Sequence, residues 1–181
     1  MKILIVYESM FGNTDQIAQK IADGLRGRGG EATLADVRHV RPGDLDGCAL
    51  LVIGAPTHAF SLSRQSTRDE AVSQGAEPSR AAYGVREWLR TLETTFPTPA
   101  GRPKVVSFDT RVDKVRRLPG SAAKRAARVL RTRGFELLDA PTSFYVVDIK
   151  GPAAPGELDR ACAWGARLFQ LARGERERDA S

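Results

Sequence analysis

Residues 2–18 read KILIVYESMFGNTDQIA, a strand pattern that passes through a short polar loop into a helix pattern. Residues 2–7 form a nearly continuous apolar run, which is typical of a parallel strand buried on both faces. Between Thr14 and Arg28, apolar side chains recur at helical spacing, so a helix is predicted there. The chain therefore begins with a strand, a loop and a helix.

The same alternation continues along the rest of the chain. We predict further strands at 31–36, 49–54 and 104–109, a last strand over 136–147 interrupted near Pro141, and helices at 84–95, 121–133 and 158–173. Such an order indicates an α/β fold, a doubly wound parallel sheet with helices on both faces. We expect one domain over residues 1–173 and a charged, disordered tail over residues 174–181.

The composition limits the classes of protein and site. No apolar run reaches the length of a membrane span, and the N-terminal run is too short for a signal peptide, so we expect a cytoplasmic protein without a membrane partner. The chain has two cysteines and two histidines, in no metal or redox spacing, so we expect no metal site. No catalytic acid–base pair or nucleophile stands out either.

The net charge is +6, and residues 111–133 hold the one concentration of cations, opposed only by Asp113. The simplest interpretation is a solvated helix face with its preceding loop. A nucleic-acid role is disfavoured, because no aromatic side chains are interleaved for base stacking. Segment 60–83 is long for a strand-to-helix connection, so we interpret it as a lid over a site or an insertion that faces a partner.

Ligands of such sheets bind beyond the carboxyl ends of the strands, here after Tyr7, Gly54 and Phe108. In the first loop, Ser9 and Thr14 offer hydroxyl groups, and the backbone from Phe11 to Asn13 offers N–H groups at a helix N-terminus. This set suits a phosphate monoester. The loop has no lysine, so it is not a P-loop. The alternative is a plain helix cap, with Asn13 capping and Gln16 completing a capping box.

The segment YESMFGNT, residues 7–14, followed by Ile17 and Ala18, closely resembles the phosphate-loop signature of the flavodoxin family. GAPTHAF, residues 54–60, resembles the family stretch that lies along the isoalloxazine ring, and SFDTRV, residues 107–112, occupies the other flavin-flanking loop. Residues 151–152 and 156–158 resemble the start of the family's final helix. The resemblance spans residues 1–172 and implies strand order 2-1-3-4-5 and bound FMN.

The resemblance also implies the residues that bind the cofactor. They are Ser9, Met10, Phe11, Gly12, Asn13, Thr14, Pro56, Thr57, His58, Ala59, Phe60, Asp109, Thr110 and Arg111. We expect His58 or Phe60 to stack on the ring. Arg111 has two interpretations, a cation at the pyrimidine edge of the flavin or the exposed start of the basic stretch.

Three features depart from a standard flavodoxin. Residues 57–63 contain no glycine for a peptide flip near flavin N5, the chain is basic rather than acidic, and the third loop has no Tyr or Trp. We favour an FMN protein that transfers electrons between redox partners, one of them an acidic protein. One alternative is an FMN-dependent NAD(P)H:quinone oxidoreductase, with arginines near 64–68 or 111–117 binding the nucleotide phosphate. The other is a flavin-free binding or regulatory module on the same fold.

Overall fold

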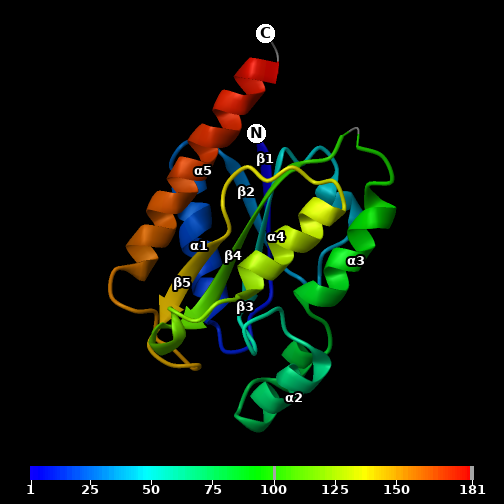
Figure 1. The fold of residues 1–181 in the computed structure, drawn as a ribbon. Coiled ribbons are helices and arrows are strands. Elements are labelled where there is room, and N and C mark those ends of the chain that lie inside the picture. The colour runs from blue at the N-terminus through cyan, green and yellow to red at the C-terminus, as the bar shows by residue number, and fades with distance from the viewer. Residues whose placement is uncertain (100, 180–181) are drawn as a thin grey trace.

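The computed structural model describes residues 1–99 and 101–179. Its centre is a five-stranded parallel sheet with the order β2-β1-β3-β4-β5 (Figure 1). The strands are β1 (Lys2–Tyr7), β2 (Glu31–Asp36), β3 (Leu50–Pro56), β4 (Lys104–Val112) and β5 (Thr142–Val146). The predicted fold class and strand order are confirmed.

Helices cover both faces of the sheet. They are α1 (Asn13–Arg26), α2 (Gln65–Ser73), α3 (Val85–Thr95), α4 (Ala122–Thr132) and α5 (Glu157–Asp179), with short 3₁₀ turns at Pro42–Leu45, Pro78–Ala81 and Asp113–Val115. Helices α1 and α5 pack on one face and α3 and α4 on the other, while α2 extends from the end of the sheet at which the strands finish (Figure 1).

Side chains of β1 show why its apolar run is continuous. Leu4 and Val6 join the core under α3 and α4, whereas Ile3 and Ile5 join the core under α1 and α5. Because successive side chains of a strand point to opposite faces, a strand covered on both sides needs apolar residues at every position. Both cores thus depend on the sequence pattern of the central strands.

The C-terminal boundary differs from the prediction. Helix α5 continues through Gly174 to Asp179, so the expected tail is wrong for residues 174–179. The charged side chains there form ion pairs along the helix, Arg173 with Glu177 and Arg178 with Glu175, and such pairs support an exposed helix. Residues 180–181 of the expected tail lie outside the described residues.

The segment after Phe108, the third one expected to face a ligand, also differs from the prediction. Residues 110–112 were expected in a loop, but β4 continues to Val112, because β5 pairs with Phe108–Val112. Before β5, only Leu137 forms an isolated bridge with Val105, so the early half of the predicted last strand is nearly absent. Segment 60–83 folds into α2 and the 3₁₀ turn Pro78–Ala81.

Candidate functional site

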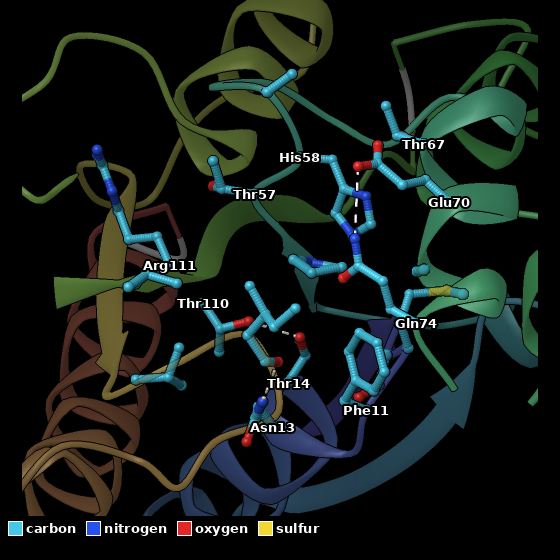
Figure 2. Close-up of a pocket in the computed structure, with 18 residues that line it drawn as sticks. Phe11, Asn13, Thr14, Thr57, His58, Thr67, Glu70, Gln74, Thr110 and Arg111 are labelled. Atoms are coloured by element: carbon cyan, nitrogen blue, oxygen red, sulfur yellow. Dashed lines mark hydrogen bonds between the residues drawn. The ribbon is translucent and has the colours of Figure 1, made fainter. Parts of the chain in front are cut away.

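A cavity of about 250 Å³ lies at the carboxyl ends of β1, β3 and β4 (Figure 2). It is bounded by the loop after β1, the loop after β3, one side of α2, the end of β4 and the loop after β5. Its lining residues are Ser9, Met10, Phe11, Asn13, Thr14, Pro56, Thr57, His58, Ala59, Thr67, Glu70, Ala71, Gln74, Thr110, Arg111, Val112, Val146 and Ile149.

The loop after β1 is ordered by its own hydroxyl group. Ser9 Oγ accepts hydrogen bonds from the N–H groups of Gly12 (3.1 Å) and Asp15 (3.3 Å). Gly12 has φ = 89°, a left-handed conformation that glycine adopts without steric cost, and it forms the N-cap of α1. The backbone therefore turns sharply and aims the start of α1 at the cavity.

The N-cap residue of α1 is Gly12, which has no side chain, and Asn13 is the first residue of the helix, so the alternative of a plain cap by Asn13 is wrong. Instead, Asn13 Nδ2 donates to the carbonyl oxygen of Ile149 at 3.0 Å and ties the first loop to the loop after β5. Among the described residues, nothing accepts a hydrogen bond from the backbone N–H of Asn13 or Thr14. Two donors with no protein acceptor thus remain where the positive end of the helix dipole lies.

Two threonine hydroxyls complete this corner of the cavity. Thr14 Oγ1 and Thr110 Oγ1 lie 2.8 Å apart, and both side chains are buried (Figure 2). Only one hydroxyl proton is used within the pair, so the other can be donated to a ligand. Hydroxyl groups, two N–H donors without protein acceptors and a helix N-terminus together fit a phosphate monoester.

The loop after β3 closes with a tight turn at His58–Ser61. The backbone N–H of each of these two residues donates to the carbonyl of the other, at 2.9 and 3.0 Å. Ala59 (φ = 45°) and Phe60 (φ = 60°) both adopt left-handed conformations, as a type I′ turn requires. The Phe60 side chain is 46% exposed and does not line the cavity, so its predicted place there is wrong.

His58 is the aromatic candidate that does line the cavity, beside Thr67 and Glu70 of α2 (Figure 2). Burial lowers the pKa of His58, and the Arg68 guanidinium lowers it further, although the Thr67 carbonyl opposes both effects. The imidazole is therefore neutral at pH 7, and it presents a flat surface and a polar ring nitrogen rather than a charge.

Side chains of β4 alternate at the cavity edge. Thr110 faces the cavity, whereas Asp109 is fully buried away from it, and its Oδ2 accepts from the N–H of Ala123 at the start of α4 (2.8 Å). Burial raises the pKa of Asp109. The prediction that Asp109 lines the site is therefore wrong, because this strand residue points to the opposite face of the sheet.

Arg111 is 5% exposed, and its guanidinium donates to the carbonyls of Leu118 (3.2 Å) and Gly120 (3.3 Å). It is thus not the exposed start of the basic stretch. Part of its side chain lines the cavity, but its cationic end points away from the labelled threonines (Figure 2). The guanidinium holds the loop after β4 in place.

Helix α2 and its C-cap supply a wall of the cavity, formed by Thr67, Glu70, Ala71 and Gln74, from the segment that was interpreted as a lid or a partner-facing insertion. The helix is held by Arg68, which is 1% exposed and donates to Ser63 Oγ, the Ala81 carbonyl and Glu87 Oε2. Residues 65–73 have no clear apolar periodicity, so the length of the segment pointed to a functional role but did not identify the individual residues. Val112, Val146 and Ile149 were missed as well, because their place follows from the pairing of β4 with β5.

The other predicted residues line the cavity, except Gly12, whose backbone shapes the turn. Within the described ranges, no cluster of three or more His, Cys, Asp or Glu side chains could hold a metal ion. No described helix is long and apolar enough to cross a membrane.

Comparison with known proteins agrees with this geometry. The family model described as flavodoxin matches residues 5–78, which include the loops after β1 and β3. This chain has a flavodoxin-like fold. Among curated proteins, no sequence matches the flavodoxin-like chain.

Solved structures share the fold over 94–99% of this chain. Flavodoxin 2 from Bacillus cereus is 23% identical, with a TM-score of 0.66 over 94% of this chain and 98% of that one. A flavodoxin from the domain Archaea is 15% identical, with a TM-score of 0.65 over 96% and 99%. Rubredoxin oxygen:oxidoreductase from Desulfovibrio gigas is 17% identical, with a TM-score of 0.66 over 99% of this chain but 37% of that chain. These similarities establish the fold.

Proposed function

We propose that this protein binds FMN in the cavity and transfers electrons between redox partners. The observation that carries the proposal is the phosphate corner, in which two N–H donors without protein acceptors stand beside the Thr14–Thr110 hydroxyl pair. When bound, FMN supplies reversible electron transfer, so the protein needs to contribute binding and electrostatics.

Different residues of the chain would bind the phosphate, contact the ring and exclude water. The backbone of Asn13 and Thr14 would hold the phosphate, and Thr110 would add a hydroxyl from β4. Pro56 and His58 would lie along the ring, where the neutral imidazole adds no charge to the cavity. Met10 and Ala71 are buried and pack together beside the loop, which excludes water from that wall.

A second candidate is an FMN-dependent NAD(P)H:quinone oxidoreductase. The observation in its favour is the wall from α2, where Gln74 Nε2 lies 3.4 Å from Glu70 Oε1 and both side chains reach the cavity. These polar groups lie outside the phosphate corner and could orient a second substrate. Steady oxidation of NADPH with a quinone acceptor would favour this enzyme over the carrier.

The phosphate corner is tested by the double variant S9A/T14A. Each hydrogen bond to a charged group contributes about 1.5–3 kcal/mol, so we expect the dissociation constant for FMN to rise about 100-fold or more. FMN is titrated against the flavin-free protein by fluorescence quenching. Circular dichroism checks that the fold is kept.

The matched control is S66A/T132A, which removes the same two kinds of hydroxyl from exposed positions of α2 and α4. We expect it to bind FMN like the parent protein. If S9A/T14A also retains the parent affinity, the phosphate does not bind at this corner. If the parent protein itself ignores FMN, the flavin-free module becomes the better description.

A further inference from the structure

The rim of the cavity exposes large apolar side chains. In the described part of the chain, the large hydrophobic residues that remain exposed are Phe60, Leu118, Val147 and Ile149, at 45–50% exposure. They come from the loops that follow β3, β4 and β5. Exposed apolar groups gathered around one opening mark an interaction site more often than a random surface does. We name these four residues the apolar rim.

Hydrogen bonds and close packing hold the loops that carry the apolar rim. Arg111 binds the carbonyl of Leu118 and that of Gly120. Gly120 packs so closely on the Phe60 carbonyl that a Cβ there would lie 2.9 Å from its oxygen. On the other side, Asn13 binds the carbonyl of Ile149. The apolar rim is thus held by the same contacts that shape the cavity, and a partner would meet a surface that is already formed.

Cations surround one side of the apolar rim. We define the basic face as Arg64, Lys114, Arg117, Lys124, Arg125 and Arg128. All six are exposed, and none forms an ion pair with a described acidic group. Elsewhere, many cations are neutralised, as in the pairs Arg38–Asp36, Lys104–Glu136 and Arg167–Asp139. Exposed cations without an ion pair also occur elsewhere, for example Arg28, Arg41 and Arg90, but the basic face concentrates five of them within residues 114–128, on both sides of the apolar-rim residue Leu118.

The clustering of these cations makes the folded structure around the start of α4 less stable. Lys124 and Arg125 lie near the N-terminus of α4, whose first turn has no acidic residue, and cations are unfavourable at this end of a helix dipole. Burial lowers the pKa of Arg86, and the guanidinium groups of Arg64 and Arg125 lower it further. Features that oppose local stability occur at functional sites, where binding compensates for them.

We propose that the apolar rim and the basic face form one docking surface for an acidic redox protein. The proposal rests on the proposed function, because electrons would leave the flavin through this opening. Helix α4 carries three cations of the basic face over about 6 Å, and three more lie in segments outside α4, which is more positive charge than one nucleotide phosphate requires. A weak electron-transfer complex needs only a small apolar centre with complementary charge around it.

The test uses the FMN-loaded protein and two haem proteins of opposite charge, acidic cytochrome b5 and basic cytochrome c. The flavin is photoreduced and mixed with either ferric protein in a stopped-flow instrument. Each fully reduced flavin gives one electron to each of two ferric haems and releases its protons to solvent. We expect the rate with cytochrome b5 to fall as ionic strength rises from about 20 to about 200 mM, and the rate with cytochrome c to rise.

Charge reversal locates the surface. The variant R117E/R125E should lose about tenfold or more of the low-salt rate with cytochrome b5. The control R28E/R176E makes the same change in net charge at exposed positions, Arg28 just after α1 and Arg176 in the last turns of α5. Figure 1 shows that α5 ends at the opposite end of the molecule from the ends of the strands. The control should keep most of the rate. An equal loss in both variants, or a rate with cytochrome b5 that does not depend on salt, overturns the proposal.

Docking is also measured without flavin, from the anisotropy of labelled cytochrome b5 mixed with each variant at low salt. If the parent protein and R28E/R176E bind while R117E/R125E does not, the docking surface stands even if FMN titration fails. If FMN binds but no variant distinguishes the haem proteins, the docking surface alone fails. Tight binding of a DNA duplex that displaces cytochrome b5 would assign the basic face to nucleic acid instead.

Discussion

Two neighbouring residues, Ala59 and Phe60, occupy backbone conformations that side chains disfavour. With φ of 45° and 60°, they form a turn in which glycine or asparagine is usual. A left-handed conformation costs a residue with a Cβ roughly 1–2 kcal/mol. The surrounding contacts must offset this cost, since the loop after β3 forms one wall of the cavity and the Phe60 carbonyl packs on Gly120.

Substitution of Ala59 by glycine should relieve the strain of its left-handed backbone, whereas the same substitution at an unstrained alanine only adds entropy to the unfolded chain. We expect A59G to leave the free energy of unfolding unchanged or to raise it by up to about 1 kcal/mol, because relief of strain exceeds the entropy that glycine adds to the unfolded chain. The control A82G changes an exposed alanine with φ = −64°, and it should lower the free energy by about 0.5–1 kcal/mol. Urea denaturation of both variants measures the difference, and equal losses would mean that Ala59 is not strained.

For single residues, the sequence predicted which chemical groups line the cavity better than it predicted where each side chain points. Ser9 and Thr14 were predicted from their hydroxyl groups and Thr110 from the resemblance of its loop, and the structure places all three at the cavity. Phe60 was placed there by its distance from a strand end, and Asp109 by the same resemblance as Thr110. One points outward because of a left-handed turn, and the other points to the far face of β4. Neither a turn's handedness nor the end of a strand's pairing can be read from residue types alone.

Helices α1 and α5 approach each other through one glycine each. A Cβ on Gly24 would lie 1.9 Å from the Cys162 carbonyl oxygen, and a Cβ on Gly165 would lie 2.2 Å from the Ile21 carbonyl oxygen. Both obstacles are backbone atoms, so a side chain could be accommodated only if the helices moved apart. This contact seals the core that contains Ile3 and Ile5.

For two glycines in α5, Gly165 and Gly174, we therefore expect substitution by alanine to have opposite effects on the free energy of unfolding. G165A should lower the free energy of unfolding by about 1–3 kcal/mol or more, because it overpacks the helix contact. G174A, where a Cβ meets nothing within 4 Å, should raise it by about 0.4–1 kcal/mol, because alanine favours a helix. Guanidinium denaturation measures both. Stabilisation by G165A would show that the helices pack less closely than described.

Elements with a strong apolar pattern were predicted within one or two residues, as β1 and β3 illustrate. Helix α2 was not, because its place depends on the buried Arg68 and its partners in three other segments rather than on an apolar stripe. The extension of α5 past Gly174 was missed for a related reason. Its support is a series of ion pairs, which resembles the composition of a disordered tail.

Over the whole molecule, burial of carboxyl groups links stability to pH. Glu8 follows β1 and is 2% exposed, and its Oε2 accepts from the N–H of Val85. Burial raises the pKa of Glu8 and that of Asp109. An unfolded chain loses these protons near pH 4, whereas the folded chain keeps them to higher pH. The folded state then binds more protons, so each group makes stability fall as pH rises from about 4 through its raised pKa.

The variant D109N isolates this effect, because an asparagine oxygen can still accept from Ala123 while no buried charge can form. The lowered pKa of His58 makes stability rise as pH rises towards 6.5. The test therefore compares each variant with the parent at the same pH, rather than relying on the pH dependence of the parent alone. We expect the stability of D109N relative to the parent to increase steadily between about pH 4 and pH 7. Urea denaturation at several pH values measures it, with the exposed substitution D69N for comparison. If the free energies of unfolding of D109N and D69N change with pH in the same way as that of the parent, Asp109 is ionised in the folded protein throughout this range. The N-terminus of α4 then compensates for the burial of its charge.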